Sequence, residues 1–468
     1  MKPVEKTVEQ QKKGMSRRNF MGSTAAVFTI VPSSVLAQSA QRSPSDKLNV
    51  AAIGAGGMGN SNINNLAGEK VDPGKRENIV ALCDVDDVQA AKTYKEFPKA
   101  KTYRDFRVML EKQKDIDAVV VGTPDHVHAA ATMAALELGK HVYCEKPLTY
   151  SIFEARTVTK AAREAGVATQ MGNQGHAMES IRLLCEWILD GAIGNVTEVR
   201  AWTPHPVWPQ GMLHRPAETL PVPDTLSWDL WLGPAPVRPY HPCYLPRLWR
   251  GWLDFGTGGL GDMGCHIFDH IVWSLKLGAP ESVEASGSAF VPDTMTWDKP
   301  VNTETYPQAS IVTYKFPARE GFPPLILTWY DGGLMPPRPE ELPGGIRMGD
   351  DFGGALYIGD KGKILCGSHG ADGLRIIPEE RMRDYVRPPK TLPRSIGHIQ
   401  EWIAACKGGP AAGSNFDYAG PLSETVLLGN AAIRAGAKLR WDAANMRFPG
   451  MPEAEQYLHR VYREGWSL

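Results

Sequence analysis

Three closely spaced glycines and a later aspartate form the first group of residues whose spacing suggests chemistry. Gly54, Gly56 and Gly59 follow the apolar run "KLNVAAI" and precede a helical pattern. Glycines at this spacing let the backbone approach a pyrophosphate, and the helix N-terminus adds unpaired N–H groups and a partial positive charge. Asp84 ends the next apolar run, where a carboxylate accepts hydrogen bonds from both ribose hydroxyls and repels a 2′-phosphate. The group predicts a dinucleotide site that prefers NAD to NADP.

The segments that must position this site alternate between strands and helices. The apolar runs "NIVALC", "DAVVV" and "HVYC" alternate with helical patterns, which indicates parallel strands joined by crossover helices. A capping box formed by Ser151 and Glu154 starts a helix that stops at Gly166. We therefore expect an α/β, doubly wound Rossmann domain over residues 48–172.

From residue 173 onward the pattern changes. One helix is expected at "AMESIRLLCEWILDG", and it is followed by the strand-like runs "VTEVRAWT", "SVEASGSAF", "ASIVTYKF" and "LILTWYDGG". The run "ALYIGDKGKILCG" predicts a hairpin that turns at residues 359–362. Strands without intervening helices favour a large, mostly antiparallel open sheet, so we expect residues 173–468 to form an α+β domain that binds substrate.

The composition excludes several classes of protein. The 468 residues are 43% hydrophobic and 22% charged, as in an ordinary globular protein. The chain has 51 Lys and Arg against 52 Asp and Glu, so it lacks the basic excess that nucleic-acid binding requires. The seven cysteines are odd in number and scattered, which argues against a disulfide framework. Past the N-terminus no run reaches the ~18 apolar residues of a membrane span, so no stable membrane anchor is expected.

The N-terminus has the three parts of an export signal. A basic stretch includes the pair Arg17 and Arg18 in "SRRNFM", an apolar run covers residues 25–31, and small residues end at Ala37. The paired arginines indicate the twin-arginine route, which carries folded proteins. We expect a signal peptide at residues 1–37, a linker at residues 38–47, and a periplasmic or secreted mature protein.

Further motifs identify a family resemblance. The segments "GTPDHVH", "CEKPLT" and "GGLGDMGCH" follow the glycine motif in order. With them, the chain from Leu48 to Asp442 resembles the Gfo/Idh/MocA oxidoreductases. The resemblance implies a Rossmann domain packed against an open-sheet domain, an NAD cofactor, a small carbohydrate substrate and a homo-oligomer. The export signal resembles that of the family's periplasmic glucose–fructose oxidoreductases and NAD-dependent glycosidases.

The resemblance also implies a catalytic group of Lys146, Asp262 and His266. The Lys146 ammonium is suited to stabilise an alkoxide as it develops. Asp262 and His266 are four residues apart on an expected helix, hence on one face. His266 is the candidate base, and Asp262 either bonds the substrate or fixes the imidazole. His270, one turn further, leaves open a metal-binding stripe as an alternative, although we expect no metal.

The expected cofactor contacts come from the glycine turn and from the loops that follow the later strands. They are Gly54, Gly56, Gly57, Met58, Gly59, Asp84, Thr123, Pro124, His128, Glu145 and Asn173. Glu145 is expected to orient Lys146 or the nicotinamide ribose, and Asn173 to reach the pocket. His128 either lies near the nicotinamide or is a structural residue of its helix.

Aromatic residues are concentrated in one part of the chain. Eight of the 13 tryptophans fall in residues 187–273. Flat aromatic faces with polar neighbours suit sugar rings, although the same tryptophans could cover a sheet or an oligomer interface. The expected substrate contacts are His205, Tyr244, Arg250 and Trp252.

An exported protein that uses NAD has no pool from which to replace it. We therefore expect tightly held NAD that returns each hydride it takes. The favoured activity is oxidation of a secondary hydroxyl, with C3 as the expected position, in a sugar, glycoside or polyol. The alternative is a redox-neutral glycosidase that works by oxidation, elimination, water addition and re-reduction. A sensor without catalysis is less favoured, because it needs only the glycine turn and Asp84.

Overall fold

The first sheet has six parallel strands in the order β3-β2-β1-β4-β5-β6. The structure is a computed structural model that describes residues 46–288, 297 and 302–468. The predicted signal peptide lies outside the described residues. The strands are β1 (Asn49–Ile53), β2 (Asn78–Cys83), β3 (Lys101–Tyr103), β4 (Ala118–Val121), β5 (His141–Cys144) and β6 (Thr169–Met171). The strand order reverses between β1 and β4, which opens a crevice at the carboxyl ends where ligands bind in such folds. The predicted doubly wound domain is confirmed.

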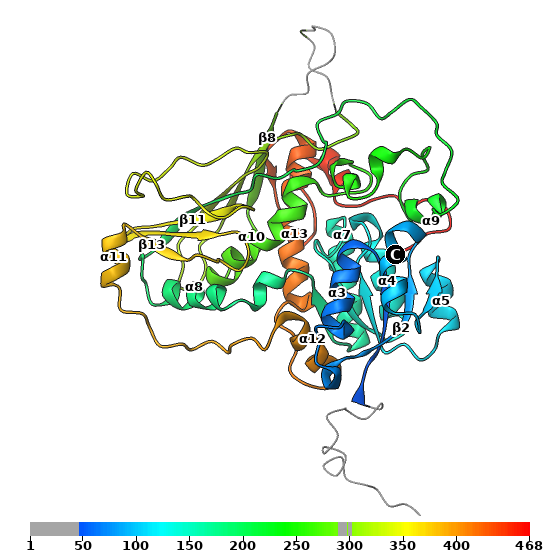
Figure 1. Ribbon diagram of the computed structural model, residues 1–468. Helices are drawn as coiled ribbons and strands as arrows, with labels where there is room; N and C mark the ends of the chain where they lie inside the picture. The colour runs from blue at the N-terminus through cyan, green and yellow to red at the C-terminus, as the bar shows by residue number, and fades with distance from the viewer. Residues whose placement is uncertain (1–45, 289–296, 298–301) are drawn as a thin grey trace, which may run out of the picture.

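Helices cover both faces of this sheet, which explains why its central strands are apolar throughout. All four residues of β4 are buried. The helices are α3 (Gly57–Ala67), α4 (Asp87–Glu96), α5 (Phe106–Lys112), α6 (Asp125–Leu136) and α7 (Ile152–Ala165). Figure 1 shows the sheet within the blue and cyan part of the molecule, beside α3, α4 and α5. The predicted capping box begins α7, and Gly166 ends it in the left-handed conformation.

One covering helix comes from the far end of the sequence. Ile399 and Trp402 of α12 (His398–Cys406) pack with Val50 of β1 and Val120 of β4. The last residues of the chain also return to the first domain, where the Trp466 ring lies 6.0 Å from the Phe106 ring. Residues 173–468 therefore do not all pack as one separate unit, and the predicted boundary at residue 172 stays a prediction.

The second sheet has eight strands in the order β13-β12-β11-β7-β10-β9-β8-β14. They are β7 (Val196–Trp202), β8 (Ser282–Gly287), β9 (Ser310–Phe316), β10 (Leu325–Tyr330), β11 (Gly354–Gly359), β12 (Gly362–Gly367), β13 (Arg375–Ile377) and β14 (Leu439–Arg440). Neighbouring strands pair antiparallel except for β7 and β10, which are parallel. This confirms the mostly antiparallel sheet and the hairpin between β11 and β12.

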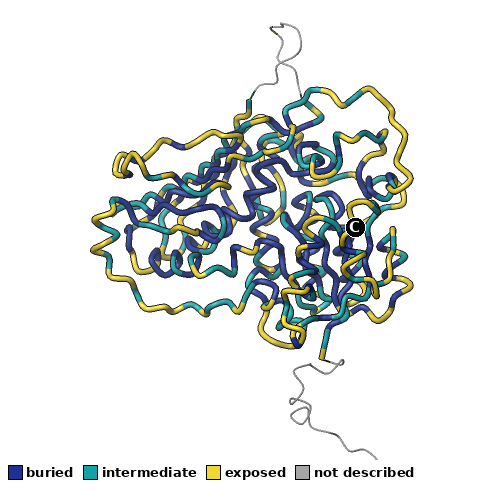
Figure 2. The backbone as a smooth tube through the Cα atoms, in the orientation of Figure 1, coloured by how far each residue is buried: buried dark blue, intermediate teal, exposed yellow. Residues whose placement is uncertain are grey.

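Three helices cover one face of the second sheet and join it to the first domain (Figures 1 and 2). They are α8 (Glu179–Leu189), α10 (Gly258–Ser274) and α13 (Phe416–Ala435). Phe268 of α10 packs edge to face against Tyr314 and Trp329 of the sheet, with ring centroids 5.5 Å apart in both pairs. Helix α10 therefore lies between the two domains, and no helix among the described residues is long and apolar enough to cross a membrane.

The aromatic segment before α10 forms a small core of its own. It contains the short helix α9 (Trp228–Leu232), whose Trp228 and Trp231 rings are stacked 4.8 Å apart. Tyr244 and Trp252 belong to the same cluster, with their rings 4.9 Å apart. Trp228, Trp231, Trp249 and Trp252 thus pack into this cluster.

Candidate functional site

The glycine turn at the end of β1 has the shape that a pyrophosphate requires. Gly54 has a φ of +83°, and a Cβ on Gly59 would lie 1.8 Å from the Gly54 carbonyl oxygen. Both positions therefore need glycine. A Cβ on Gly57 would meet nothing within 4 Å, and the Met58 side chain is 47% exposed. The turn is closed toward the sheet and open toward the crevice.

Asp84 supports this turn directly. Its Oδ2 accepts hydrogen bonds from the N–H groups of Ala55 at 2.8 Å and Gly56 at 3.1 Å, and its Oδ1 accepts from Asp86 at 3.0 Å. A carboxylate has about four acceptor positions, so about one is left in this conformation. The two ribose bonds expected from the sequence would require one of these backbone contacts to shift. Burial raises the pKa of Asp84 to about 6, although the three N–H groups oppose this.

His128 connects two loops that border the crevice. Its Nδ1 lies 2.8 Å from the Pro147 carbonyl oxygen, and its Nε2 lies 2.9 Å from that of Thr123. Burial disfavours the charged ring, but Cys144 and Asp125 outweigh burial and the pKa of His128 is raised to about 10. A protonated ring donates to both carbonyls. His128 thus ties the two loops together, and its expected place near the nicotinamide stays a prediction.

Two buried polar atoms along the crevice have no partner among the described residues. They are Thr123 Oγ1 and Asn173 Nδ2. The other amide atom of Asn173, Oδ1, accepts a hydrogen bond from Ser414 at 2.6 Å, which fixes the orientation of the amide. The open glycine turn, Asp84 and these two free polar atoms suit a dinucleotide, which offers hydroxyl, phosphate and amide groups.

Glu145 is held by Asn62, which was not among the expected site residues. The Asn62 side chain, on α3, donates to Glu145 Oε1 at 2.8 Å. Burial raises the pKa of Glu145, and Asn62 and Lys146 oppose the rise. The only sequence signal for Asn62 is a buried amide in the helix that follows the glycine motif.

Lys146 and Asp262 form an ion pair across the two domains. Lys146 Nζ donates to the Asp262 carboxylate at 2.8 Å and to its backbone carbonyl at 2.6 Å. Asp262 Oδ1 also accepts from Arg250 Nε at 3.0 Å, and Oδ2 lies 3.1 Å from His205 Nδ1. Burial alone would raise the pKa of Asp262, but Lys146, His205 and Arg250 hold it well below its usual range. Asp262 is therefore ionised, and one N–H of Lys146 has no partner among the described residues.

His266 lies one turn beyond Asp262 on α10 without bonding to it. The Asp262 carboxylate binds His205 instead, so the expectation that Asp262 fixes the His266 imidazole is not met in this structure. Burial and the Lys146 charge lower the pKa of His266 well below its ordinary value. His266 Nδ1 is enclosed without a partner, whereas Nε2 is not enclosed and makes no hydrogen bond among the described residues. His266 is thus a neutral imidazole with an available acceptor.

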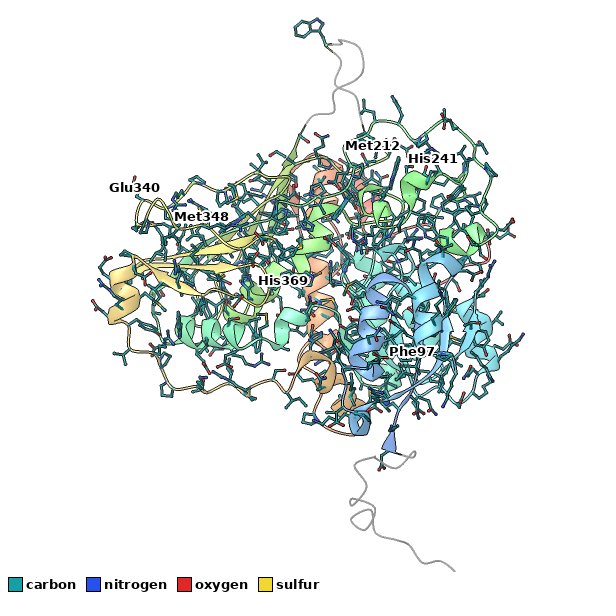
Figure 3. All side chains as sticks on the ribbon, in the orientation of Figure 1. Phe97, Met212, His241, Glu340, Met348 and His369 are labelled. Carbon is teal, nitrogen blue, oxygen red and sulfur yellow. The ribbon has the colours of Figure 1, made fainter. Side chains whose placement is uncertain are left out.

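A third imidazole, His369, completes the group and was not anticipated. Its ring lies 4.2 Å from the His266 ring, and Figure 3 shows His369 near the middle of the molecule. It follows β12 in the loop "GSHGADG", far along the sequence from the other site residues. A histidine just past a strand end was the only signal that could have found it.

The four expected substrate contacts divide into two pairs. His205 and Arg250 reach Asp262, as described above. Tyr244 and Trp252 are 2% and 1% exposed within the aromatic core, and the Trp252 indole N–H is bonded to the Cys243 carbonyl. Their rings offer no free face, so the structure does not bring them to the site.

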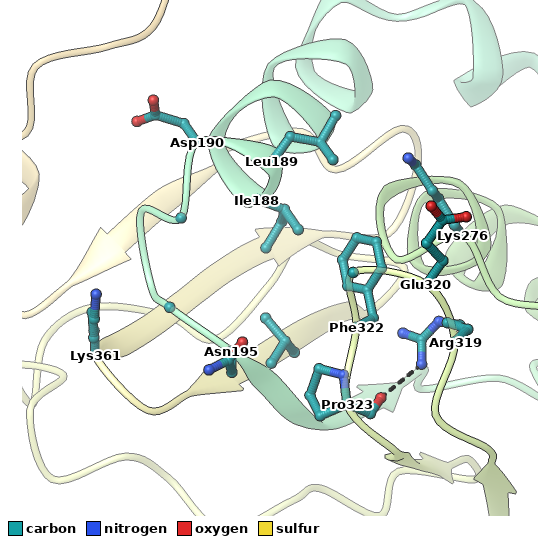
Figure 4. A pocket seen from close by; sticks show the side chains of 14 residues that line it. Ile188, Leu189, Asp190, Asn195, Lys276, Arg319, Glu320, Phe322, Pro323 and Lys361 are labelled. Atoms are coloured by element: carbon teal, nitrogen blue, oxygen red, sulfur yellow. Dashed lines mark hydrogen bonds between the residues drawn. The ribbon is translucent and has the colours of Figure 1, made fainter.

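Two other features lie outside this group. His270 Nδ1 is 2.8 Å from the Tyr357 hydroxyl, and within the described residues no cluster of three or more His, Cys, Asp or Glu could hold a metal ion. A hollow of about 790 Å³ opens beside the end of α8 and the loop at residues 319–323 (Figure 4). Arg319 there donates to the carbonyls of Leu275 and Pro323, so its charge already has backbone partners.

Comparison with known proteins identifies the family. Residues 48–173 match an oxidoreductase family with an NAD-binding Rossmann fold, and residues 183–312 match the C-terminal alpha/beta domain of that family. The chain belongs to the Gfo/Idh/MocA oxidoreductase family. The first sheet and its crevice are accordingly the NAD-binding domain of a Gfo/Idh/MocA protein.

Curated members of the Gfo/Idh/MocA family match only part of the chain. A 1,5-anhydro-D-fructose reductase of Ensifer adhaerens is 29% identical over 179 residues, 37% of this chain and 42% of the relative. A levoglucosan dehydrogenase of Pseudarthrobacter phenanthrenivorans is 25% identical over 209 residues, 44% of each chain. The chain thus spans less than half the length of these relatives.

The solved structures extend the likeness to the whole fold. The WlbA dehydrogenase from Bordetella pertussis, in complex with NADH and UDP-GlcNAcA, is 18% identical with a TM-score of 0.56. The match covers 85% of this chain and 99% of that chain. At this identity the likeness shows the fold alone, and it includes both the Rossmann domain and the open-sheet domain.

Proposed function

We propose that this protein is an NAD-dependent dehydrogenase that oxidises a secondary hydroxyl, at C3, of a sugar, glycoside or polyol. The observation that carries the proposal is the bond from Lys146 to Asp262, 2.8 Å long, which joins the NAD-binding domain to α10. It fixes a cation at the crevice beside a neutral imidazole, His266. Both curated relatives reported above act on carbohydrates by name, which supports the substrate class.

In this proposal two side chains have different roles at the substrate hydroxyl. The free N–H of Lys146 donates to the substrate oxygen and stabilises negative charge as it develops. His266 Nε2 accepts the hydroxyl proton, because it is the ring nitrogen that is not enclosed. Bound NAD supplies the hydride acceptor. The turn at Gly54–Gly59, Asp84, Thr123 and Asn173 hold it.

Asp262 is the positioning residue for this arrangement. Its carboxylate holds Lys146, Arg250 and His205 together, so that two cations and one imidazole keep fixed positions around one anion. His205 donates Nδ1–H to Asp262, since an ionised carboxylate only accepts. Its Nε2 is then an acceptor for a second substrate hydroxyl.

The proposal includes captive NAD and export in the folded state to the periplasm. Both depend on the signal in residues 1–37, outside the described residues. We also propose a homo-oligomer, because part of the open sheet presents exposed side chains such as Ile326. A protein that carries its cofactor through export must return each hydride to a second carbonyl compound or to an intermediate of the same substrate.

One experiment tests the central proposal. The mature protein is denatured and the released small molecules are measured by mass spectrometry, and we expect about one NAD per chain. The native protein is then mixed with a panel of glycosides while absorbance in the reduced-nicotinamide band is followed. A lasting change supports the dehydrogenase. Release of the aglycone without a lasting change supports the redox-neutral glycosidase, and silence with every sugar contradicts both.

A further inference from the structure

One carboxylate, Asp350, organises an edge of the site that neither the family resemblance nor the proposed mechanism uses. Asp350 Oδ1 accepts from the Phe352 N–H at 2.8 Å, and its Oδ2 accepts from the Ser368 N–H at 2.8 Å. A Cβ on Gly353 would lie 2.0 Å from the Trp202 carbonyl oxygen, so the turn packs tightly against the end of β7. Asp350 therefore holds a turn and the end of β12 in one fixed arrangement.

The hydrogen bonds of this edge determine the tautomer of His369. The Ser368 hydroxyl lies 2.9 Å from both oxygens of Asp350 and 2.8 Å from His369 Nδ1. An ionised carboxylate only accepts, so the single hydroxyl proton of Ser368 goes to Asp350. The Ser368 oxygen then accepts from His369 Nδ1–H. His369 Nε2 is left as an acceptor and makes no hydrogen bond among the described residues.

Phe352 presents an exposed aromatic ring beside these groups. Its side chain is 51% exposed, although its backbone is fixed by Asp350 and by a 2.7 Å bond from the Thr203 hydroxyl to its carbonyl. The ring lies 5.6 Å from the His369 ring and 6.3 Å from the His205 ring. A rigidly held aromatic face is thus open to solvent next to two imidazoles of the site.

We propose that Phe352 and His369 form a platform for a ring-shaped carbohydrate, with the C–H face of a pyranose on Phe352 and a ring hydroxyl donating to His369 Nε2. Aromatic faces recognise the apolar side of such rings, and fixed acceptors read their hydroxyls. An open-chain polyol has no flat C–H face, so the platform selects rings over alditols. This inference rests on the proposed function and narrows its substrate class.

Saturation-transfer NMR on the mature protein tests the platform without requiring turnover. The probes are the methyl pyranosides of glucose, galactose and mannose, with glucitol, galactitol and mannitol as the open-chain set. We expect at least one pyranoside to bind and the alditols not to bind. Phe352→Ala should lower the affinity for that pyranoside about tenfold. Phe352→Tyr should change the affinity by no more than about twofold, because it keeps the aromatic face. His369→Ala should also lower the affinity for that pyranoside, since it removes the Nε2 acceptor.

Phe153→Ala is the matched control. Phe153 is 39% exposed and its ring contacts His459, away from the site residues. The substitution Phe153→Ala should leave the affinity for pyranosides unchanged. Equal binding by wild type and Phe352→Ala, equal binding of alditols, or no binding of any pyranoside would each overturn the platform. Ring binding without hydride transfer would instead overturn the proposed dehydrogenase, so the two failures are distinguishable.

Discussion

The NAD-binding crevice and the substrate side of the site are built in opposite ways. The turn at Gly54–Gly59 and its brace Asp84 come from two neighbouring strands and their connections. On the substrate side, His205, Asp262 and His369 come from separate segments that meet only in the folded chain. Local spacing is enough to specify the first region, whereas the second depends on the packing of α10 between two sheets.

The aromatic segment gives the largest test of this difference. Trp252→Ala should lower the free energy of unfolding by about 3–5 kcal/mol, because it empties a buried site in the aromatic core. Thermal and denaturant unfolding would measure the loss. Under conditions where the variant stays folded, the KM for sugar should be unchanged. A raised KM together with normal stability would instead indicate that Trp252 contacts the substrate.

Lys146→Ala should act on chemistry alone. Removing the donor to the developing alkoxide should lower kcat by about 10²–10³-fold. Bound NAD, measured after denaturation, should stay near one per chain, because the glycine turn and Asp84 are untouched. If NAD is lost together with activity, Lys146 belongs to the cofactor site and the two regions are less separate than the geometry indicates.

Gly59→Ala should disturb the crevice itself. The added methyl group would lie 1.8 Å from the Gly54 carbonyl oxygen, and such overpacking typically costs about 1–3 kcal/mol. A lower melting temperature and loss of NAD are expected. Gly278→Ala is the control, since a Cβ there meets nothing within 4 Å. Retention of NAD by Gly59→Ala would show that the turn tolerates a side chain.

The pH dependence of NAD affinity should follow the protonation of the Asp84 carboxylate. Its pKa is raised to about 6 by burial, and ribose hydroxyls donate to the ionised form. Affinity should therefore fall as the pH drops below 6, by up to about tenfold between pH 7 and pH 5. The exchange rate of labelled NAD would report this, and Asp84→Asn should flatten the profile. An unchanged profile in the variant would assign the titration to another group.

The parts of the protein that could be predicted from sequence share one property. The glycine turn, the capping box at Ser151 and the β11–β12 hairpin are each encoded by residues close in the sequence, and each appears as expected. The partner of Asp262 could not be predicted, because helical spacing favours His266 whereas the loop after β7 delivers His205. The burial of Trp252 could not be predicted either. A tryptophan in a core and a tryptophan on a binding face contribute to the composition in the same way.

The return of α12 to the first sheet has a consequence for biosynthesis. Trp402 covers Val50 and Val120, which belong to the first strands to leave the ribosome. Trp402 joins that apolar cluster only when nearly the whole polypeptide has been translated, so we expect the N-terminal domain to complete its packing late in synthesis.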